Sequence, residues 1–105
     1  MMVEGEKSAA ALHSLGVSAV GLPGALAAAS VDLVPLDGVD VVLWPDNDKV
    51  GADAMDILAG RLARTHRRID TDLLDLPEKG DAADLVAVGD LADSAAIWKR
   101  LGPAL

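Results

Sequence analysis

Two carboxylates follow the strongest apolar run in this sequence. Residues 41–44 read Val-Val-Leu-Trp, and Asp46 and Asp48 come just after it, beyond a proline. Another acidic segment begins with Glu4, directly after the short apolar start of the chain. Crowded carboxylates repel one another, and a bound divalent cation relieves that repulsion. The competing interpretation is that Asp46 and Asp48 are turn residues, because aspartate is common where a strand ends.

The apolar pattern predicts the elements that hold these acids. Residues 39–44 form a valine-rich run broken only by Asp40, which is typical of a parallel strand buried on both faces. Strands are predicted at residues 1–3, 17–22, 39–44 and 68–76, and helices at residues 9–15, 25–29, 51–65, 82–86 and 90–101. This alternation predicts an α/β fold of Rossmann-like type, a parallel sheet of about four strands with helices on both faces.

Ligands bind beyond the carboxyl ends of the strands in such sheets. The loops after Val3, Trp44 and Leu76 belong to that edge, so a set of acidic residues is expected to converge there. They are Glu4, Asp46, Asp48 and Asp81. An all-oxygen set without a nearby histidine or cysteine selects Mg²⁺ or Mn²⁺ over zinc. The presence of Glu4 at the same edge therefore favours a metal site over a simple turn.

Spacing within the helices predicts which side chains are buried. Ser8 is expected to cap the first helix. The buried stripe of the 51–65 helix is expected to consist of Val50, Ala54, Leu58 and Leu62, and that of the last helix of Leu91, Ala95, Trp98 and Leu101. Trp98 is expected to anchor the last helix, and Trp44 to lie in the core or to line a pocket.

The composition narrows the class of protein. A chain of 105 residues is expected to form a single domain over residues 1–105. The lack of cysteine excludes disulfides, thiolate metal sites and cysteine nucleophiles. A formal net charge of -8 argues against a general nucleic-acid binder, because affinity for phosphates comes mainly from Lys and Arg. The longest apolar stretches are broken by Gly and Pro, and no signal segment is visible, so we expect a cytoplasmic location and no membrane partner.

Four short segments, met in order along the chain, carry a family resemblance. They read Val3-Glu4-Gly5-Glu6-Lys7, Leu22-Pro23-Gly24-Ala25, Leu43-Trp44-Pro45-Asp46-Asn47-Asp48 followed by Gly51, Ala54 and Met55, and Leu76-Pro77-Glu78-Lys79-Gly80-Asp81-Ala82-Ala83-Asp84. Together they resemble a Toprim domain, most closely those of phage and plasmid primases and primase-helicases. The resemblance covers residues 3–85. It implies a Toprim fold with a Rossmann-like parallel sheet and Mg²⁺-dependent chemistry on phosphodiesters.

The resemblance also implies roles for the acidic residues. Glu4 matches the family glutamate, which assists metal binding and is proposed to act as general acid or base. Asp46 and Asp48 match the metal-coordinating pair. Asp81 and Asp84 match a later acidic motif of replicative primases.

Lysines complete this implied nucleotide site. Lys7 and Lys79 stand where a lysine could meet a nucleotide phosphate. The alternative is that both are ordinary solvated lysines. The site predicted from the resemblance thus combines Mg²⁺ with Lys7, Lys79 and the later acidic motif.

A basic cluster contains Arg61, Arg64, Arg67 and Arg68, with His66 among them. Arg61, Arg64 and Arg68 are predicted to share one helix face. They could contact nucleic-acid phosphates and offset the acidic charge of the chain. The competing interpretation is a solvated helix end, where positive side chains meet the helix dipole.

By its resemblance, the chain is expected to be the catalytic Toprim domain of a phage- or plasmid-type DNA primase. It would use Mg²⁺ or Mn²⁺ to transfer nucleotidyl groups in RNA primer synthesis during DNA replication. Its expected partners are nucleotides, a single-stranded DNA template and other primase or helicase domains or chains. The short first strand and the missing zinc-binding domain depart from the family pattern, so the chain is expected to be a fragment or split part of a larger primase.

Other functions stay open at this stage. A Toprim nuclease would use the same carboxylates to hydrolyse phosphodiesters with water. A non-catalytic module that binds nucleotide or metal for assembly would need only part of the site. A receiver-like phosphoacceptor domain fits less well, because it needs an acidic pair after the first strand and a lysine after the last.

Overall fold

The centre of the molecule is a sheet of four parallel strands in the order β2-β1-β3-β4. The computed structural model describes residues 1–36, 39–62, 66–89, 91 and 93–105, and leaves out the side chains of residues 25, 26, 35, 88 and 89. The strands are β1 (Met2–Glu4), β2 (Val20–Leu22), β3 (Val41–Trp44) and β4 (His66–Arg68). The predicted α/β fold with a four-stranded parallel sheet is therefore confirmed.

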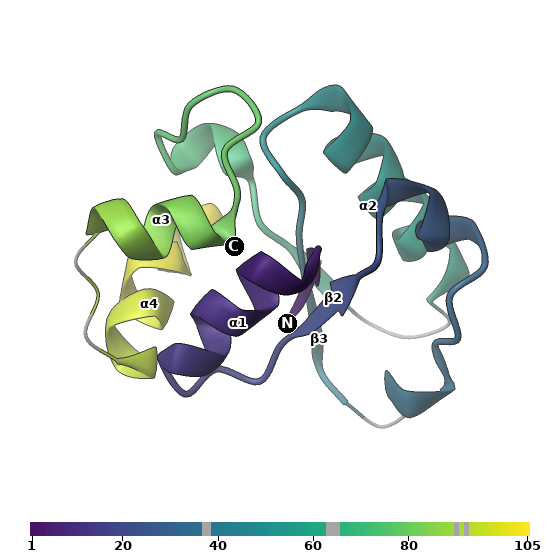
Figure 1. Ribbon diagram of the computed structural model, residues 1–105, viewed down its shortest axis with the longest axis horizontal. Coiled ribbons are helices and arrows are strands. Elements are labelled where there is room, and N and C mark those ends of the chain that lie inside the picture. Colours follow the sequence, from purple (N-terminus) through teal and green to yellow (C-terminus); the bar gives the residue numbers. More distant parts are fainter. Residues whose placement is uncertain (37–38, 63–65, 90, 92) are drawn as a thin grey trace.

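Helices cover both faces of this sheet. Those described are α1 (Glu6–Ser14), α2 (Lys49–Arg61), α3 (Ala82–Gly89) and α4 (Ser94–Leu101), with short 3-10 turns η1 (Ala25–Ala29), η2 (Val34–Leu36), η3 (Thr71–Leu73) and η4 (Gly102–Ala104). Figure 1 shows α1, α3 and α4 on one side of the strands and α2 on the other.

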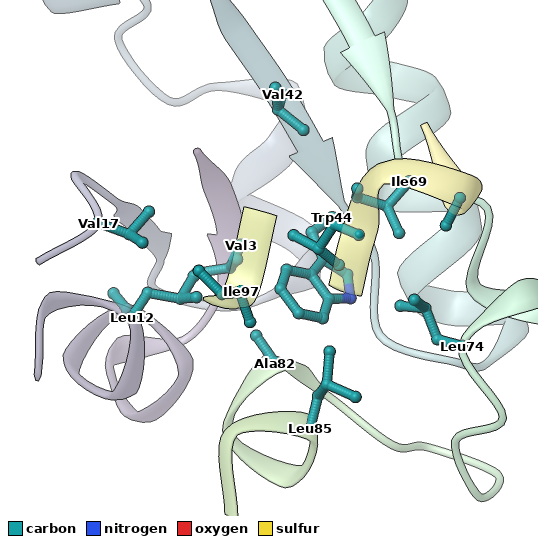
Figure 2. Packing of buried hydrophobic residues seen from close by; sticks show 13 residues of the cluster. Val3, Leu12, Val17, Val42, Trp44, Ile69, Leu74, Ala82, Leu85 and Ile97 are labelled. Atoms are coloured by element: carbon teal, nitrogen blue, oxygen red, sulfur yellow. The ribbon is translucent and has the colours of Figure 1, made fainter. Parts of the chain in front are cut away.

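The pleat of the strands divides the apolar residues between two cores. In β3, Val42 and Trp44 face the core of α1, α3 and α4, whereas Val41 and Leu43 face the core of α2. Side chains alternate in this way because successive residues of a strand point to opposite faces. Figure 2 shows the indole of Trp44 among its apolar neighbours in the first core. The expectation that Trp44 lies in the core is confirmed.

The second helix differs from its predicted bounds. It begins at Lys49 because the Asp48 side chain caps it, and the chain is extended again at Leu62. The helix was predicted to reach residue 65. This prediction is wrong at Leu62, and residues 63–65 lie outside the described residues. Its buried residues are Gly51, Ala54, Met55 and Leu58. Val50, predicted to be buried, is 62% exposed.

Two other predictions about helices are wrong. The first helix begins at Glu6 after Gly5, so Ser8 is not its cap but a buried residue of its first turn. The last helix begins at Ser94, where the Asp93 carboxylate accepts the Ala96 N–H at 2.9 Å. Ile97 and Leu101 are its buried residues, whereas Trp98 is 37% exposed and is not its anchor.

The predicted strand at residues 68–76 is mostly a turn. The strand β4 ends at Arg68, and the Asp70 carboxylate then accepts the Asp72 N–H at 3.0 Å. Such a local hydrogen bond draws the chain out of a ladder. The 3-10 turn η3 follows directly, so Ile69 and Leu74 are buried in the core without forming a strand.

Within the part of the chain that the structure describes, no helix has both the length and the apolar character needed to cross a membrane.

The buried stripe of α2 can be tested by paired truncations. We expect Leu58→Ala to lower the free energy of unfolding by about 3 kcal/mol, because Leu58 is fully buried and its loss leaves a cavity. The matched control Val50→Ala, one residue into the same helix, should change it by less than about 0.5 kcal/mol. Urea unfolding followed by circular dichroism measures both. Equal losses for the two variants would contradict the observed stripe.

Candidate functional site

The order of strands in this sheet reverses between β1 and β3. The chain passes from β1 to β2 on one side and then crosses β1 to place β3 and β4 on the other. In open parallel sheets, ligands bind beyond the carboxyl ends of the strands at such a reversal. Glu4 is the last residue of β1, and Asp46 lies just beyond β3. The two acids predicted to meet thus flank the point where ligands bind in such folds.

A hydrogen bond joins these two loops directly. The Oε2 atom of Glu4 accepts the backbone N–H of Asp46 at 3.0 Å. Both residues are half-buried. The contact fixes one oxygen of the Glu4 carboxylate against the start of the Asp46 loop.

Gly5 and Gly21 allow the turn after β1 to pack closely against β2. Gly5 has a φ of 78°, a backbone conformation that side chains disfavour, and its N–H donates to the Leu22 carbonyl at 2.7 Å. A Cβ at Gly21 would lie only 2.4 Å from the Gly5 carbonyl oxygen. The turn after Glu4 can therefore sit this close to β2 only because residue 21 is glycine.

Gly51 has the same importance on the other side of Glu4. A Cβ at residue 51 would lie 2.6 Å from Glu4 Oε2, 2.8 Å from the Asp46 carbonyl oxygen and 2.9 Å from its nitrogen. The first turn of α2 therefore packs directly onto the contact between Glu4 and Asp46. The Asp48 carboxylate accepts the Gly51 N–H at 2.6 Å and so begins the helix. The positive end of the helix dipole then faces a cluster of carboxylates, which lowers their repulsion.

The surroundings of Asp46 disfavour its ionised form. Burial is the largest cause, and together with the charges of Glu4, Asp81 and Asp48 and a hydrogen bond with Glu4 it raises the pKa of Asp46 from its ordinary value of 3.8 to about 7. The charges of Glu4, Asp48 and Asp81 thus act on Asp46 from the loops after β1, β3 and β4. Like charges near a carboxyl disfavour its ionised form, so this repulsion adds to the effect of burial.

The acidic residues described here do not form a complete metal-binding site by themselves. Among the residues described, no group of three His, Cys, Asp or Glu side chains is placed to hold a metal ion together. One oxygen of Asp48 accepts the hydrogen bond that caps α2. Mg²⁺ keeps several waters and often uses only one or two carboxylates. The carboxylates of Glu4 and Asp46 supply oxygen donors of the kind that a hydrated Mg²⁺ takes.

Asn47 ties a third loop to the site, a role that the sequence analysis missed. Its N–H donates to the Gly80 carbonyl at 2.7 Å, and its carbonyl accepts the Lys79 N–H at 2.9 Å. Its side-chain amide donates to the carbonyls of Leu76 at 3.0 Å and Pro77 at 3.1 Å. The sequence does contain a signal for this role. An asparagine stands between two aspartates, and its side-chain amide can donate hydrogen bonds, which an ionised aspartate cannot.

The later acidic motif serves a structural purpose at the start of α3. The Asp84 carboxylate accepts the Asp81 N–H at 3.0 Å, and the Asp81 carboxylate accepts the Asp84 N–H at 2.9 Å. This reciprocal pair of hydrogen bonds forms a capping box, which satisfies the backbone N–H groups of Asp81 and Asp84 at the start of the helix. Asp81 still acts electrostatically on Asp46. Asp84 is placed by the structure in the cap.

The two predicted lysines are exposed near the site. Lys79 lies in the loop held by Asn47 and has a φ of 62°. Lys7 lies in the first turn of α1, just after the Glu4 turn. Both side chains are therefore accessible from the carboxyl edge of the sheet.

The predicted basic helix face is wrong. Arg61 ends α2, Arg68 lies on β4, and Arg64 lies outside the described residues. Arg61 donates to the carbonyls of Ala28 at 2.8 Å and Val31 at 2.6 Å, so it closes the end of η1.

The guanidinium of Arg68 is also used within the fold. It pairs with Asp56 and donates to the Ala52 carbonyl at 3.1 Å, both on α2. It thereby ties β4 to the helix. The same side chain lines a pocket of about 290 Å³ next to the Asp46 loop, together with Pro45 and Thr71.

Comparison with protein-family models finds no match, and comparisons with curated proteins and with solved structures find no significant match either. The Toprim resemblance therefore stays a prediction that depends on the four segments of sequence.

The close approach at Gly51 makes a testable difference between two glycines of one helix. We expect Gly51→Ala to lower the free energy of unfolding by about 2 kcal/mol, because the new methyl group displaces Glu4 and Asp46. The control Gly60→Ala meets no atom within 4 Å and should raise stability by about 0.5–1 kcal/mol through better helix propensity. Urea unfolding of both variants measures the difference. A stabilising Gly51→Ala would contradict the packing described above.

The raised pKa of Asp46 predicts how stability depends on pH. The folded protein holds a proton on this carboxyl more tightly than the unfolded chain, so this contribution is full below pH 3.8 and is lost as the pH rises to about 7. Asp46→Asn cannot ionise. At about pH 8 in EDTA it should be more stable than the wild type by about 1 kcal/mol, a figure kept small because solvent reaches this half-buried group.

Urea unfolding of the wild type and of Asp46→Asn at several pH values measures the sign of this difference in stability. The difference between the two proteins should reach its low-pH limit only well below pH 3.8, where Asp46 is protonated in both the folded and the unfolded state. A wild type that exceeds Asp46→Asn in stability at alkaline pH without metal would contradict the prediction.

Proposed function

We propose that the carboxyl edge of the sheet is a Mg²⁺-dependent site for nucleotidyl transfer, the catalytic centre of a phage- or plasmid-type primase that makes RNA primers in DNA replication. The observation that carries this proposal is the contact between Glu4 Oε2 and the Asp46 N–H at the point where the strand order reverses. The four segments that resemble a Toprim domain support the choice of reaction.

Each acidic residue has a distinct part in this proposal. Glu4 and Asp46 would hold the metal directly, and Asp48 would support it from the start of α2. When bound, Mg²⁺ neutralises charge on the transferring phosphoryl group and orients the attacking oxygen. Glu4 would also move a proton to or from the reacting hydroxyl, with the Asp46 N–H keeping its carboxylate in place.

The substrate would approach along the same edge. Lys7 and Lys79 are exposed there and supply positive charge for phosphates. The pocket beside Pro45 and Thr71 offers about 290 Å³ next to the Asp46 loop, which suits part of a nucleotide. The chain as a whole has a net charge of -8, so the proposal assigns most template binding to other primase or helicase domains or chains.

Metal binding is the first test of this function. Titration with Mg²⁺ or Mn²⁺, followed by calorimetry and by NMR of the backbone amides, should place the ion at residues 4–6 and 46–51. We expect Asp46→Ala to weaken the affinity at least about tenfold, because a central oxygen ligand is lost. Asp53→Ala removes the same charge from an exposed position on α2 and should leave the affinity unchanged. Equal affinities for the wild type and Asp46→Ala would contradict the proposed site.

The reaction itself requires a separate assay. The protein is mixed with Mg²⁺, ribonucleotides and a single-stranded DNA template, with and without added zinc-binding and helicase domains of a phage-type primase. Primer synthesis that Asp46→Ala abolishes and Asp53→Ala retains is the expected result. Cleavage of labelled DNA or RNA with Mn²⁺, without primer synthesis, would replace the transferase by a nuclease that uses the same carboxylates. Metal binding without either reaction would leave a binding module and overturn the enzymatic proposal.

A further inference from the structure

An asparagine of the Asp46 loop holds the segment that precedes α3. Hydrogen bonds join Asn47 to residues 76–80 through both its main chain and its side-chain amide. Within that segment, the Gly80 N–H donates to the Pro77 carbonyl at 2.8 Å and closes a turn. Because Asn47 stands between the two aspartates of the loop, the turn 77–80 is fixed directly to the proposed metal site.

Lys79 takes a backbone conformation in this turn that suits glycine. Its φ is 62°, in the left-handed region, and it is the third residue of the turn. A turn with a positive φ at this position usually has glycine or asparagine there. The side chain of Lys79 therefore adds strain to a turn that glycine would form without it.

Among the residues described, none offers a partner to the ammonium group of Lys79. The side chain is exposed and has neither a hydrogen bond nor an ion pair there. Lys49, by contrast, pairs with Asp53 at 2.7 Å. Strain in the backbone commonly persists at functional sites, where it presents a group to a ligand. A strained lysine that the described part of the fold does not use thus indicates an anionic ligand.

The surroundings of the turn select the class of anion. Asp81 follows the turn directly, and its charge acts on Asp46. An anion beside these carboxylates would be repelled unless a cation lay between them. A phosphate group that contacts both Lys79 and a bound Mg²⁺ meets this condition, since Mg²⁺ sites commonly take the phosphates of a substrate. An incoming nucleotide supplies such a group.

The proposed metal ligands do not depend on the side chain of Asn47. The Asp46 N–H is held by the Glu4 carboxylate, and the Asp48 carboxylate is held by the Gly51 N–H. Loss of the Asn47 amide would therefore release the turn and leave the carboxylates in place.

We propose that Asn47 is a positioning residue, which holds the turn 77–80 so that Lys79 binds a phosphate of the nucleotide that the metal also contacts. Asn47 itself does not touch the nucleotide. This inference rests on the function proposed above and deepens it, because it selects Lys79 over Lys7 as the phosphate contact. Lys7 lies in the first turn of α1, where a lysine needs no unusual backbone conformation.

Nucleotide binding by a variant of the lysine tests the contact. Lys79→Gly removes the ammonium group and suits the positive φ, so its thermal midpoint should equal or exceed that of the wild type. Its affinity for ATP at saturating Mg²⁺, measured by calorimetry, should be at least about tenfold lower, because a charge-assisted hydrogen bond is lost. Its affinity for Mg²⁺ alone should change by less than about twofold. The control Lys49→Ala removes the same charge from a lysine that pairs with Asp53 and should leave both affinities unchanged.

A double-mutant cycle tests the role of Asn47. Asn47→Ala should lower the affinity for ATP about as much as Lys79→Gly does, and should keep the affinity for Mg²⁺ within about twofold. The variant with both changes should bind ATP no more weakly than Lys79→Gly alone, because Asn47 acts only through Lys79. A purely structural role of Asn47 would lower the affinity for Mg²⁺ together with the thermal midpoint, and its effect would multiply with that of Lys79→Gly.

The inference is overturned if Asn47→Ala binds ATP as tightly as the wild type, if it loses Mg²⁺, or if the two losses multiply in the double variant. A short single-stranded DNA should bind the wild type and Lys79→Gly equally. A loss of affinity confined to DNA would assign the lysine to the template and overturn the inference as well. Failure of the proposed function is distinguishable, because the wild type itself would then bind neither Mg²⁺ nor ATP at this edge.

Discussion

The hydrogen bond between the Glu4 carboxylate and the Asp46 N–H connects the first strand to the loop that starts α2. It exists only because residue 51 lacks a side chain, since a Cβ there would lie 2.6 Å from the Glu4 oxygen. Three elements therefore share one point of contact: the end of β1, the loop after β3 and the first turn of α2. The orientation of that helix across the sheet and the convergence of the carboxylates both depend on it.

This contact creates an electrostatic cost that the fold only partly offsets. Asp46 is half-buried near Glu4, Asp81 and Asp48, and burial first and these charges second raise its pKa to about 7. The dipole of α2 and the N–H donors at its start favour negative charge there. They do not cancel the repulsion. Under the function proposed above, the fold sacrifices stability for chemistry at this edge, as is common at functional sites.

Sequence reasoning succeeded where one strong local signal determined the structure. The run Val41–Trp44 could only be a buried strand, and the parallel sheet then placed Glu4 and Asp46 at one edge. It failed where weak, competing interactions decided the outcome. The Asp70 side chain ends β4 early by a local bond, and Arg68 is drawn to α2 by Asp56, so the basic face never forms. Asn47 was missed because its partners lie about 30 residues away.

The two tryptophans lie in different environments and can serve as intrinsic fluorescence probes. The chain has no Phe or Tyr, so its near-ultraviolet signals come from Trp44 and Trp98 alone. Trp44 is 1% exposed in an apolar core, whereas Trp98 is 37% exposed. Their fluorescence should therefore separate into a blue component and a red component, which a water-soluble quencher reaches unequally. Trp44 precedes Pro45 and Asp46 directly, so the blue component is an intrinsic optical probe of the acidic loop that needs no attached label.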